Sequence, residues 1–260
     1  MSAATEPYLV DRFGLAGRTA VVTGASRGIG LAIVGALARA GADVIGVSAS
    51  MPAGASAARA AVESAGRTFT PRACDLADRD AVAALSNELA ARDVDILVNN
   101  GGTIRRAPAA EHTDADFDAV MEVDLRAQWV LARGVGRSML ARRRGKIVST
   151  ASMLSFQGGV NVPGYAAAKH GIAGLTRALA NEWARHGVNV NAVAPGYVET
   201  DNTAALRDDP DRAAEILARI PAGRWARADD VAGAVVFLCS SAADYVHGVV
   251  LPVDGGWLAR

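Results

Sequence analysis

The feature that most constrains the fold is the regular alternation of short β-branched segments with longer, alanine-rich segments. Seven segments rich in valine, isoleucine and threonine predict strands, at 19–24, 42–48, 68–75, 94–100, 145–150, 188–196 and 249–256. Several are apolar on both faces, as strands buried in a parallel sheet are. Six segments with apolar residues at helical spacing predict helices, at 28–41, 55–66, 78–93, 114–143, 164–187 and 229–241. The alternation predicts a single α/β domain over residues 1–260, with a doubly wound parallel sheet of seven strands and helices on both faces.

The composition is that of an ordinary globular protein, with 51% apolar and 21% charged residues. Basic and acidic residues both total 27, so the formal charge is zero and gives no reason to expect nucleic acid or an anionic membrane as a partner. No apolar run approaches the roughly 20 residues of a membrane span, and no basic start followed by an apolar stretch marks a secretory signal. Cys74 and Cys239 are interpreted as two buried thiols rather than a disulfide. We therefore expect a soluble, cytoplasmic protein.

A glycine-rich segment follows the first predicted strand. "VVTGASRGIG" (21–30) lies at the first strand-to-helix turn, where folds of this kind bind ligands at the carboxyl ends of their strands. Gly24, Gly28 and Gly30 remove side chains, so that a backbone can approach a pyrophosphate at the positive end of the following helix. A tight turn alone would also explain the glycines. Their place between a strand and a helix favours dinucleotide binding and a Rossmann-type sheet.

Four motifs occur in the order that is typical of one family: "TGASRGIG" (23–30), "NNGG" (99–102), "YAAAK" (165–169) and "PGYVET" (195–200). On these motifs, which extend over most of its length, the sequence resembles the short-chain dehydrogenase/reductase family. The resemblance implies a nicotinamide cofactor and hydride transfer to or from a carbonyl or alcohol. The family usually has alanine where this chain has Gly101, a difference that removes one methyl group.

The resemblance also implies the residues of the cofactor site. Asp75 would meet the adenine, Asn99 the ribose region, and Thr200 the carboxamide or pyrophosphate. The full expected set comprises Gly24, Ser26, Arg27, Gly28, Ile29, Gly30, Ser48, Asp75, Leu76, Asn99, Gly101, Tyr165, Lys169, Pro195, Gly196, Val198 and Thr200.

The choice between NAD and NADP depends on the end of the second strand. A fold that selects NAD usually offers an acidic residue there to hold the ribose 2′-hydroxyl. Ser48 stands at this position, so no carboxylate repels a 2′-phosphate, and Arg27 could pair with one. Arg27 could instead be a solvated loop residue, and similar sequences can use NAD without an acid there. We predict NADP, with NAD as the alternative.

The resemblance assigns Tyr165 as the general acid/base, Lys169 as its helper and Ser152 as a partner that holds the substrate oxygen. The chemistry of the tyrosine and lysine side chains supports these roles independently of the resemblance. A tyrosine hydroxyl ordinarily loses its proton only near pH 10, and a nearby ammonium favours the phenolate. Lys169 lies one helical turn beyond Tyr165 and can provide that charge. A YxxxK pattern alone arises often by chance, but the glycine loop and the serine spacing favour catalysis.

Asp124 departs from the family pattern, which normally has an asparagine at this place in the long fourth helix. The family uses that position in a proton relay behind the lysine. An aspartate can still accept hydrogen bonds, and if ionised it would offset part of the pull of Lys169 on Tyr165. The alternative is that only the backbone carbonyl at this position is used. We predict a working enzyme whose pH profile can differ from those of its relatives.

Five segments go beyond the general family motifs: "GGTIRRAPA" (101–109), "ASMLSFQGGVNVPGY" (151–165), "APGYVETDNTAAL" (194–206), "IPAGRW" (220–225) and "VDGGWLAR" (253–260). Together they resemble the family branch that acts on sugar acids of the gluconate and deoxygluconate type. Arg105 and Arg106 follow the fourth predicted strand, and an arginine fork suits a carboxylate. Gln157 and Asn161 offer amides for hydroxyl groups. Asn202 could be a further hydroxyl contact or the start of a helix cap. The alternative for the two arginines is a solvated loop or a subunit contact.

Other features are interpreted more simply. The arginines at 142–144 close a predicted helix, where cations complement the helix dipole. The histidines show no ligand spacing, so we predict no metal site. The segment at about 201–225 is charged and broken by Pro210 and Pro221, and we expect a lid over the substrate rather than a plain surface excursion. The resemblance implies a homotetramer in which helices 114–143 and 164–187 pair between subunits and the carboxyl-terminal "GGWLAR" (255–260) lies near another interface.

Two other functions remain open at this point. One is a reductase of the same family that acts on 3-oxoacyl thioesters or other carbonyls; a basic patch for an acidic carrier protein would favour it, and the balanced charge speaks weakly against it. The other is a nucleotide-binding regulator without catalysis. Asp124 favours the regulator, while Ser152, Tyr165 and Lys169 oppose it.

Overall fold

A computed structural model describes residues 5–260 and contains one seven-stranded sheet. The strands are β1 (Thr19–Thr23), β2 (Asp43–Ser48), β3 (Phe69–Ala73), β4 (Ile96–Asn99), β5 (Gly145–Thr150), β6 (Val188–Pro195) and β7 (Val250–Val253). Their order is β3-β2-β1-β4-β5-β6-β7, and all neighbouring pairs are parallel. The predicted strands and the predicted doubly wound sheet are confirmed. The order reverses between β1 and β4, which is where such sheets bind ligands at their carboxyl ends.

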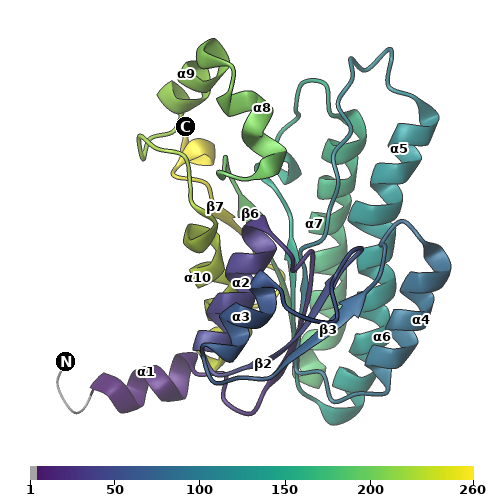
Figure 1. Cartoon of the computed structure of the whole chain (residues 1–260), viewed down its shortest axis with the longest axis vertical. Helices are drawn as coiled ribbons and strands as arrows, with labels where there is room; N and C mark the ends of the chain where they lie inside the picture. Colours follow the sequence, from purple (N-terminus) through teal and green to yellow (C-terminus); the bar gives the residue numbers. More distant parts are fainter. Residues whose placement is uncertain (1–4) are drawn as a thin grey trace.

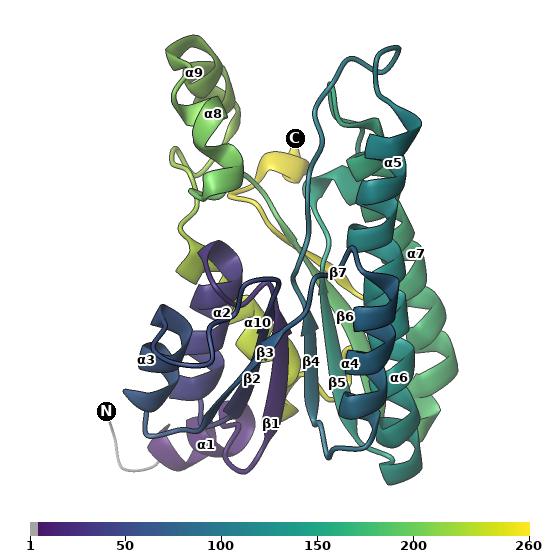
Figure 2. The same ribbon diagram turned by 45° about the vertical axis from the view of Figure 1, so that its right-hand side comes forward.

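Helices cover both faces of the sheet, as Figure 2 shows. Helices α2 (Gly28–Arg39), α3 (Ala57–Glu63) and α10 (Ala228–Cys239) pack on one face, and α4 (Arg79–Ala90), α6 (Ala127–Arg142) and α7 (Pro163–Trp183) on the other. Strand β1 explains why both faces must be covered. Ala20 and Val22 point into the core beneath α2, while Val21 points into the core beneath α4 and α6, because side chains alternate along a strand.

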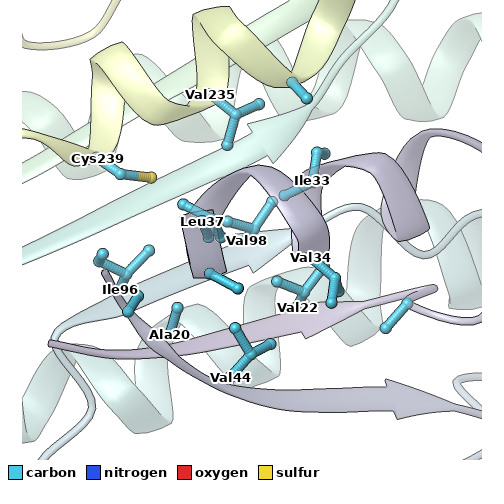
Figure 3. Close-up of a cluster of buried hydrophobic side chains, with 14 of the residues drawn as sticks. Ala20, Val22, Ile33, Val34, Leu37, Val44, Ile96, Val98, Val235 and Cys239 are labelled. Atoms are coloured by element: carbon cyan, nitrogen blue, oxygen red, sulfur yellow. The ribbon is translucent and has the colours of Figure 1, made fainter. Parts of the chain in front are cut away.

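The core beneath α2 and α10 is assembled from branched aliphatic side chains (Figure 3). Ile33, Val34 and Leu37 form the buried stripe of α2, with the spacing that places residues on one helical face. Val235 and Cys239 of α10 complete this core from the neighbouring helix. Both cysteines are free and buried, so they form no disulfide.

One predicted helix is interrupted. The segment expected as a single helix at 114–143 consists of α5 (Asp114–Met121), a π-helical turn (Glu122–Arg126) and α6. A π turn inserts one extra residue and shows no hydrophobic period, so the sequence pattern did not reveal it. The turn contains Asp124, which is wholly buried.

Two further helical regions were not predicted. Helix α1 (Thr5–Phe13) extends from the body of the molecule in Figure 1, and Tyr8 and Val10 on it are 62% and 64% exposed. The segment expected to be broken by prolines contains α8 (Ala204–Arg207) and α9 (Pro210–Arg219). Pro210 begins α9 instead of breaking it, because proline fits the first turn of a helix, where its missing N–H has no partner to lose.

Candidate active site

Two adjoining cavities lie beyond the carboxyl ends of the strands. The larger has a volume of about 780 Å³ and extends from the glycine loop to Lys169. The smaller has a volume of about 470 Å³ and lies beneath α8 and α9. Tyr165 and Asn202 line both cavities. Tyr165 is therefore a wall that the two cavities share, so a molecule in either one can reach its side chain.

The glycine loop makes one end of the larger cavity. Gly24 has a φ of +66°, which favours glycine, and a Cβ on Gly30 would collide with the backbone carbonyl oxygen of Gly24. Helix α2 begins here with no side-chain cap and no acidic residue in its first turn. Gly28 and Gly30 line the cavity, so the uncapped positive end of α2 faces it. This loop can hold an anionic group such as a pyrophosphate.

The far wall of the larger cavity lies at the end of β2. Ser48 lines it, and the Ser48 Oγ is buried without a hydrogen-bond partner among residues 5–260. Arg27 lies nearby in the glycine loop, but its Nη1 donates to Oδ2 of Asp201 at 3.1 Å. Both of these side chains are about three-quarters exposed, at 76% and 74%, so the ion pair is weak and a stronger anion can displace it.

The centre of the site is built by the start of α7. Lys169 is 2% exposed; its Nζ donates to the backbone oxygen of Thr150 at 2.9 Å and lies 5.2 Å from the centroid of the Tyr165 ring. Ser152 follows β5, and its Oγ accepts the N–H of Leu154 at 3.1 Å. The Oγ of Ser155 donates to the backbone oxygen of Lys169 at 2.7 Å. These bonds fix the turn after β5 against α7, so the serine and the tyrosine are held beside one cavity.

A second buried charge lies behind Lys169. Asp124 Oδ2 is 3.1 Å from the Lys169 Nζ, and Oδ1 accepts the N–H of Thr103 at 2.7 Å. Burial raises the pKa of Asp124, against the lowering effect of the ammonium and of the Thr103 N–H. Burial alone lowers the pKa of Lys169, but the negative charges of Asp124 and of an ionised Tyr165 outweigh it, so the net pKa is raised. Lys169 thus stays protonated at neutral pH.

The structure places most of the predicted cofactor residues around the larger cavity. Those lining it are Gly24, Ser26, Arg27, Gly28, Ile29, Gly30, Ser48, Asp75, Leu76, Gly101, Tyr165, Lys169 and Thr200, together with Asp124. Four predicted residues do not line the cavity to which they were assigned. Asn99 donates its amide to the backbone oxygen of Gln128, and its neighbour Asn100 lines the cavity instead. Pro195 and Val198 are buried, and Gly196 lines the smaller cavity.

The predicted substrate residues are divided between the two cavities. Arg106, Gln157 and Asn202 line the smaller cavity with Ser152 and Tyr165. Arg105 lines the larger cavity and lies 3.4 Å from the Asp116 carboxylate. Asn161 lines neither cavity; its φ of +62° turns the chain, and its backbone oxygen accepts the N–H of Ala107.

Several lining residues were missed by the sequence analysis. Arg212 and Arg219 of α9 line the smaller cavity, and so does Trp257 near the carboxyl terminus. The amphipathic pattern of 210–219 could have indicated a helix. Nothing in the local sequence indicates that Trp257 reaches the site, because that depends on how the chain returns after β7.

The described residues contain no helix that is both long and apolar enough to cross a membrane. Within the same part of the chain, no group of three or more side chains is arranged to bind a metal.

Comparisons with known proteins agree with this geometry. Residues 24–258 match a family model described as enoyl-(acyl carrier protein) reductase. The chain is 55% identical to 2-dehydro-3-deoxy-D-gluconate 5-dehydrogenase of Pseudoalteromonas atlantica, over 97% of this chain and 100% of that one.

Two solved structures are similar to the model. One is a candidate 2-deoxy-D-gluconate 3-dehydrogenase from Agrobacterium tumefaciens with bound NADP, with a TM-score of 0.91, 50% identity, and coverage of 96% of this chain and 100% of that one. The other is a candidate NAD(P)-dependent gluconate 5-dehydrogenase from Beutenbergia cavernae with NADP at low occupancy, with a TM-score of 0.91, 55% identity and the same coverage.

Proposed function

Since the chain belongs to the short-chain dehydrogenase/reductase family, we propose that it transfers a hydride between NADP and a secondary alcohol or ketone of a sugar acid of the gluconate or deoxygluconate type. The observation that carries the proposal is the position of Tyr165, which lines both cavities. A cofactor in the larger cavity and a substrate in the smaller one would meet at its side chain.

The larger cavity fits a dinucleotide. The uncapped start of α2 provides backbone N–H groups for the pyrophosphate, and Gly30 leaves room where a Cβ would collide. The unpartnered Ser48 Oγ suits a ribose hydroxyl or its phosphate, and no carboxylate side chain stands at this strand end to repel a 2′-phosphate. Arg27 would leave Asp201 to pair with that phosphate. These features support NADP, as in the two similar crystal structures, and the bound nicotinamide would accept or supply the hydride.

The chain's own residues would move the proton. In alcohol oxidation the Tyr165 hydroxyl, as phenolate, takes the proton of the substrate alcohol; in ketone reduction it returns a proton to the substrate oxygen. The Lys169 ammonium favours the phenolate by charge. Ser152 holds the substrate oxygen in line with Tyr165. Asp124 lines the larger cavity but would influence Tyr165 only through Lys169, so we assign it as a positioning residue.

The smaller cavity has the chemistry of a site for a polyhydroxylated acid. Arg106, which donates to the backbone oxygen of Asn202, adds positive charge and hydrogen-bond donors, and Gln157 and Asn202 provide donors and acceptors for hydroxyl groups. The similar dehydrogenases are named for acids of this kind. A reductase of acyl thioesters is the alternative that the family model's description favours.

The test is formation or loss of NADPH and NADH on purified protein. The panel is gluconate, 2-deoxygluconate, 5-ketogluconate and 2-keto-3-deoxygluconate, with an acetoacetyl thioester for the alternative. We expect turnover of a sugar acid and preference for NADP. Turnover of the thioester alone would indicate that the protein is a reductase of acyl thioesters instead. Cofactor binding with no turnover on any substrate would favour the regulator.

Tyr165→Phe separates an enzyme from a regulator. We expect the variant to lose at least about 100-fold in kcat, since general acid–base catalysis contributes about 10²–10⁴-fold. Its NADP dissociation constant, measured by fluorescence quenching, should change little. Retention of wild-type turnover would contradict the assignment of Tyr165 as the acid/base.

Three finer properties belong to this proposal. A lid at about 201–225 is supported by α8 and α9, which cover the smaller cavity. A homotetramer is inferred from the family alone, and the molar mass from light scattering checks it. A cytoplasmic location is consistent with the two free, buried thiols.

A further inference from the structure

The smaller cavity carries an excess of positive charge that the reaction at Tyr165 does not use. Its charged lining residues are Arg106, Arg212, Arg219 and Glu215. Arg212 is already paired, because its Nη1 lies 2.8 Å from the Glu215 carboxylate. Arg106 donates one N–H to the backbone oxygen of Asn202 at 3.3 Å. Arg219 donates to no acceptor and pairs with no carboxylate within residues 5–260.

Arg219 is nevertheless held in a defined position. Its guanidinium carbon lies 4.0 Å from the centroid of the Trp257 ring, so the cation stacks on the indole face. Stacking occupies the face of the guanidinium and leaves the N–H groups at its edge free. A guanidinium that is fixed by one face and unpaired at its edge is arranged to bind a planar anion, because it loses little side-chain freedom on binding.

The platform beneath Arg219 is rigid. Trp257 is 5% exposed and packs edge-on against Tyr197, with ring centroids 4.9 Å apart. The Asp254 carboxylate accepts the backbone N–H groups of Gly256 and Leu258, both at 2.9 Å, and so fixes the turn that carries the tryptophan. Arg260 donates to the backbone oxygen of Ala218 at 2.9 Å, which ties the carboxyl terminus to the end of α9. The last residues of the chain therefore hold α9 over the cavity, as their proximity in Figure 1 illustrates.

The Trp257 side chain gives a second indication of a ligand. Its Nε1 is buried and has no hydrogen-bond acceptor within the described chain. A buried donor without a partner is costly, and in a cavity wall its acceptor can arrive with a bound molecule. The Trp257 ring thus belongs to the same cavity wall as Arg219, with its own donor buried behind the surface. The free edge of the Arg219 guanidinium calls for a negatively charged ligand.

We propose that Arg219, stacked on Trp257, binds the substrate carboxylate and makes the enzyme selective for acids. This inference rests on the proposed function, because it assigns the group that recognises the acid end of that substrate. The carboxylate binds away from the reacting carbon, so Arg219 contributes to binding in both the ground state and the transition state. Its loss should therefore appear in KM rather than in kcat.

The test compares Arg219→Gln with Arg219→Lys, using the sugar acid that the wild-type protein turns over most efficiently. We expect Arg219→Gln to raise KM about 10- to 100-fold, because the variant loses a charge-assisted hydrogen-bonded pair with the carboxylate. Its kcat should stay within about threefold of the wild-type value. Arg219→Lys should recover part of this loss, because it restores the charge without the fork. Arg185→Gln, which removes the same charge at the opposite end of the sheet, is the control and should leave KM unchanged.

A binding measurement separates the two proposals. Calorimetry with tartrate, a non-reacting hydroxy acid, is performed on the wild-type and Arg219→Gln proteins saturated with NADP. Weaker tartrate binding in the variant, with unchanged NADP affinity, supports the role of Arg219 even if no sugar acid is turned over. Equal KM values and equal tartrate affinities in the two proteins would overturn the inference, while sugar-acid turnover by the wild type would leave the proposed function intact.

Discussion

At the scale of single residues, the buried ion pair behind Tyr165 is the feature with the clearest chemical consequence. Lys169 lies between Tyr165 on one side and the Asp124 carboxylate on the other. The carboxylate is wholly buried, so water does not screen its charge. Its charge helps to raise the pKa of Lys169, and by the proposed function it would also offset part of the ammonium's attraction for a Tyr165 phenolate.

Asp124→Asn should shift the pH dependence of alcohol oxidation. The amide keeps an acceptor for the Thr103 N–H but removes the negative charge, so Lys169 acts on Tyr165 without an opposing carboxylate. The ascending limb of the kcat profile should then move to lower pH by roughly one unit, the size of a charge effect over several ångströms.

The control for this variant is Asp116→Asn, which removes an exposed carboxylate near Arg105 and should leave the profile in place. A limb that moves to higher pH in Asp124→Asn would mean that Lys169, deprived of the partner that raises its pKa, loses its proton when buried. That outcome would contradict the prediction.

Gly101 shows how a neighbouring residue decides what a position tolerates. A Cβ at this position would lie 2.5 Å from Cδ1 of Leu76. The sequence alone suggested only that the glycine omits a methyl group. In the structure, the missing Cβ is required by the position of Leu76. The glycine makes the space in which Leu76 packs at the edge of the larger cavity.

At the scale of secondary-structure elements, the helices differ in how closely they approach their neighbours. Gly136 lies in α6 against the Trp183 ring of α7, where a Cβ would be 2.6 Å from the ring. Gly233 lies in α10 and faces open space: apart from its chain neighbours and the backbone of its own helix, no atom lies within 4 Å of the same added Cβ. Both positions are helical, so the backbone preference for alanine is the same and only the packing differs.

Alanine substitutions at these two positions should have opposite effects. Gly233→Ala should raise the free energy of unfolding by about 0.5–1 kcal/mol, the difference in helix propensity. Gly136→Ala should lower it by about 1–3 kcal/mol, since the added methyl group forces Trp183 to move. Urea denaturation measures both. A stabilising effect of Gly136→Ala would show that α6 and α7 can move apart at no cost.

At the scale of the whole molecule, one ion pair fastens the segment beyond α9 to the body. The Arg224 guanidinium binds the Asp230 carboxylate at 2.7 and 3.0 Å, and Asp230 also accepts the Arg227 N–H at the start of α10. The Arg224 hydrogen bond, followed by that of Arg227, lowers the pKa of Asp230 to about 2. The carboxylate is therefore ionised in the folded protein well below the pH at which it protonates in the unfolded chain.

This pair should make folding stability fall in acid. Because the folded pKa is the lower one, Asp230 contributes stability above about pH 4, the ordinary aspartate value, and loses it as pH falls toward 2. Asp230→Asn should lower the urea midpoint by a constant amount between pH 5 and pH 7, and the difference should shrink below pH 4. Asp229→Asn, in the same helical turn but outside this ion pair, is the control. A difference that persists unchanged at pH 3 would contradict the prediction.

Much of the architecture follows from local sequence. The seven strands and the main helices were predicted because short β-branched runs alternate with segments that have apolar residues at helical spacing, and both patterns are visible in the chain. The π turn at Glu122–Arg126 has no such period, and the prolines around α9 indicated a break where one of them begins a helix. Local patterns thus identify regular elements better than their irregularities.

The sequence by itself determined the sheet, the glycine loop at its reversal point, and the spacing that puts Tyr165 and Lys169 on one helical face. Those features depend on residues close together in the chain. Only the tertiary structure decided that Asp124 pairs with Lys169, that Asn100 rather than Asn99 lines the larger cavity, and that Trp257 supports Arg219 over the smaller one. The physical reason is that these contacts join segments far apart in sequence, whose meeting is set by packing of the whole molecule.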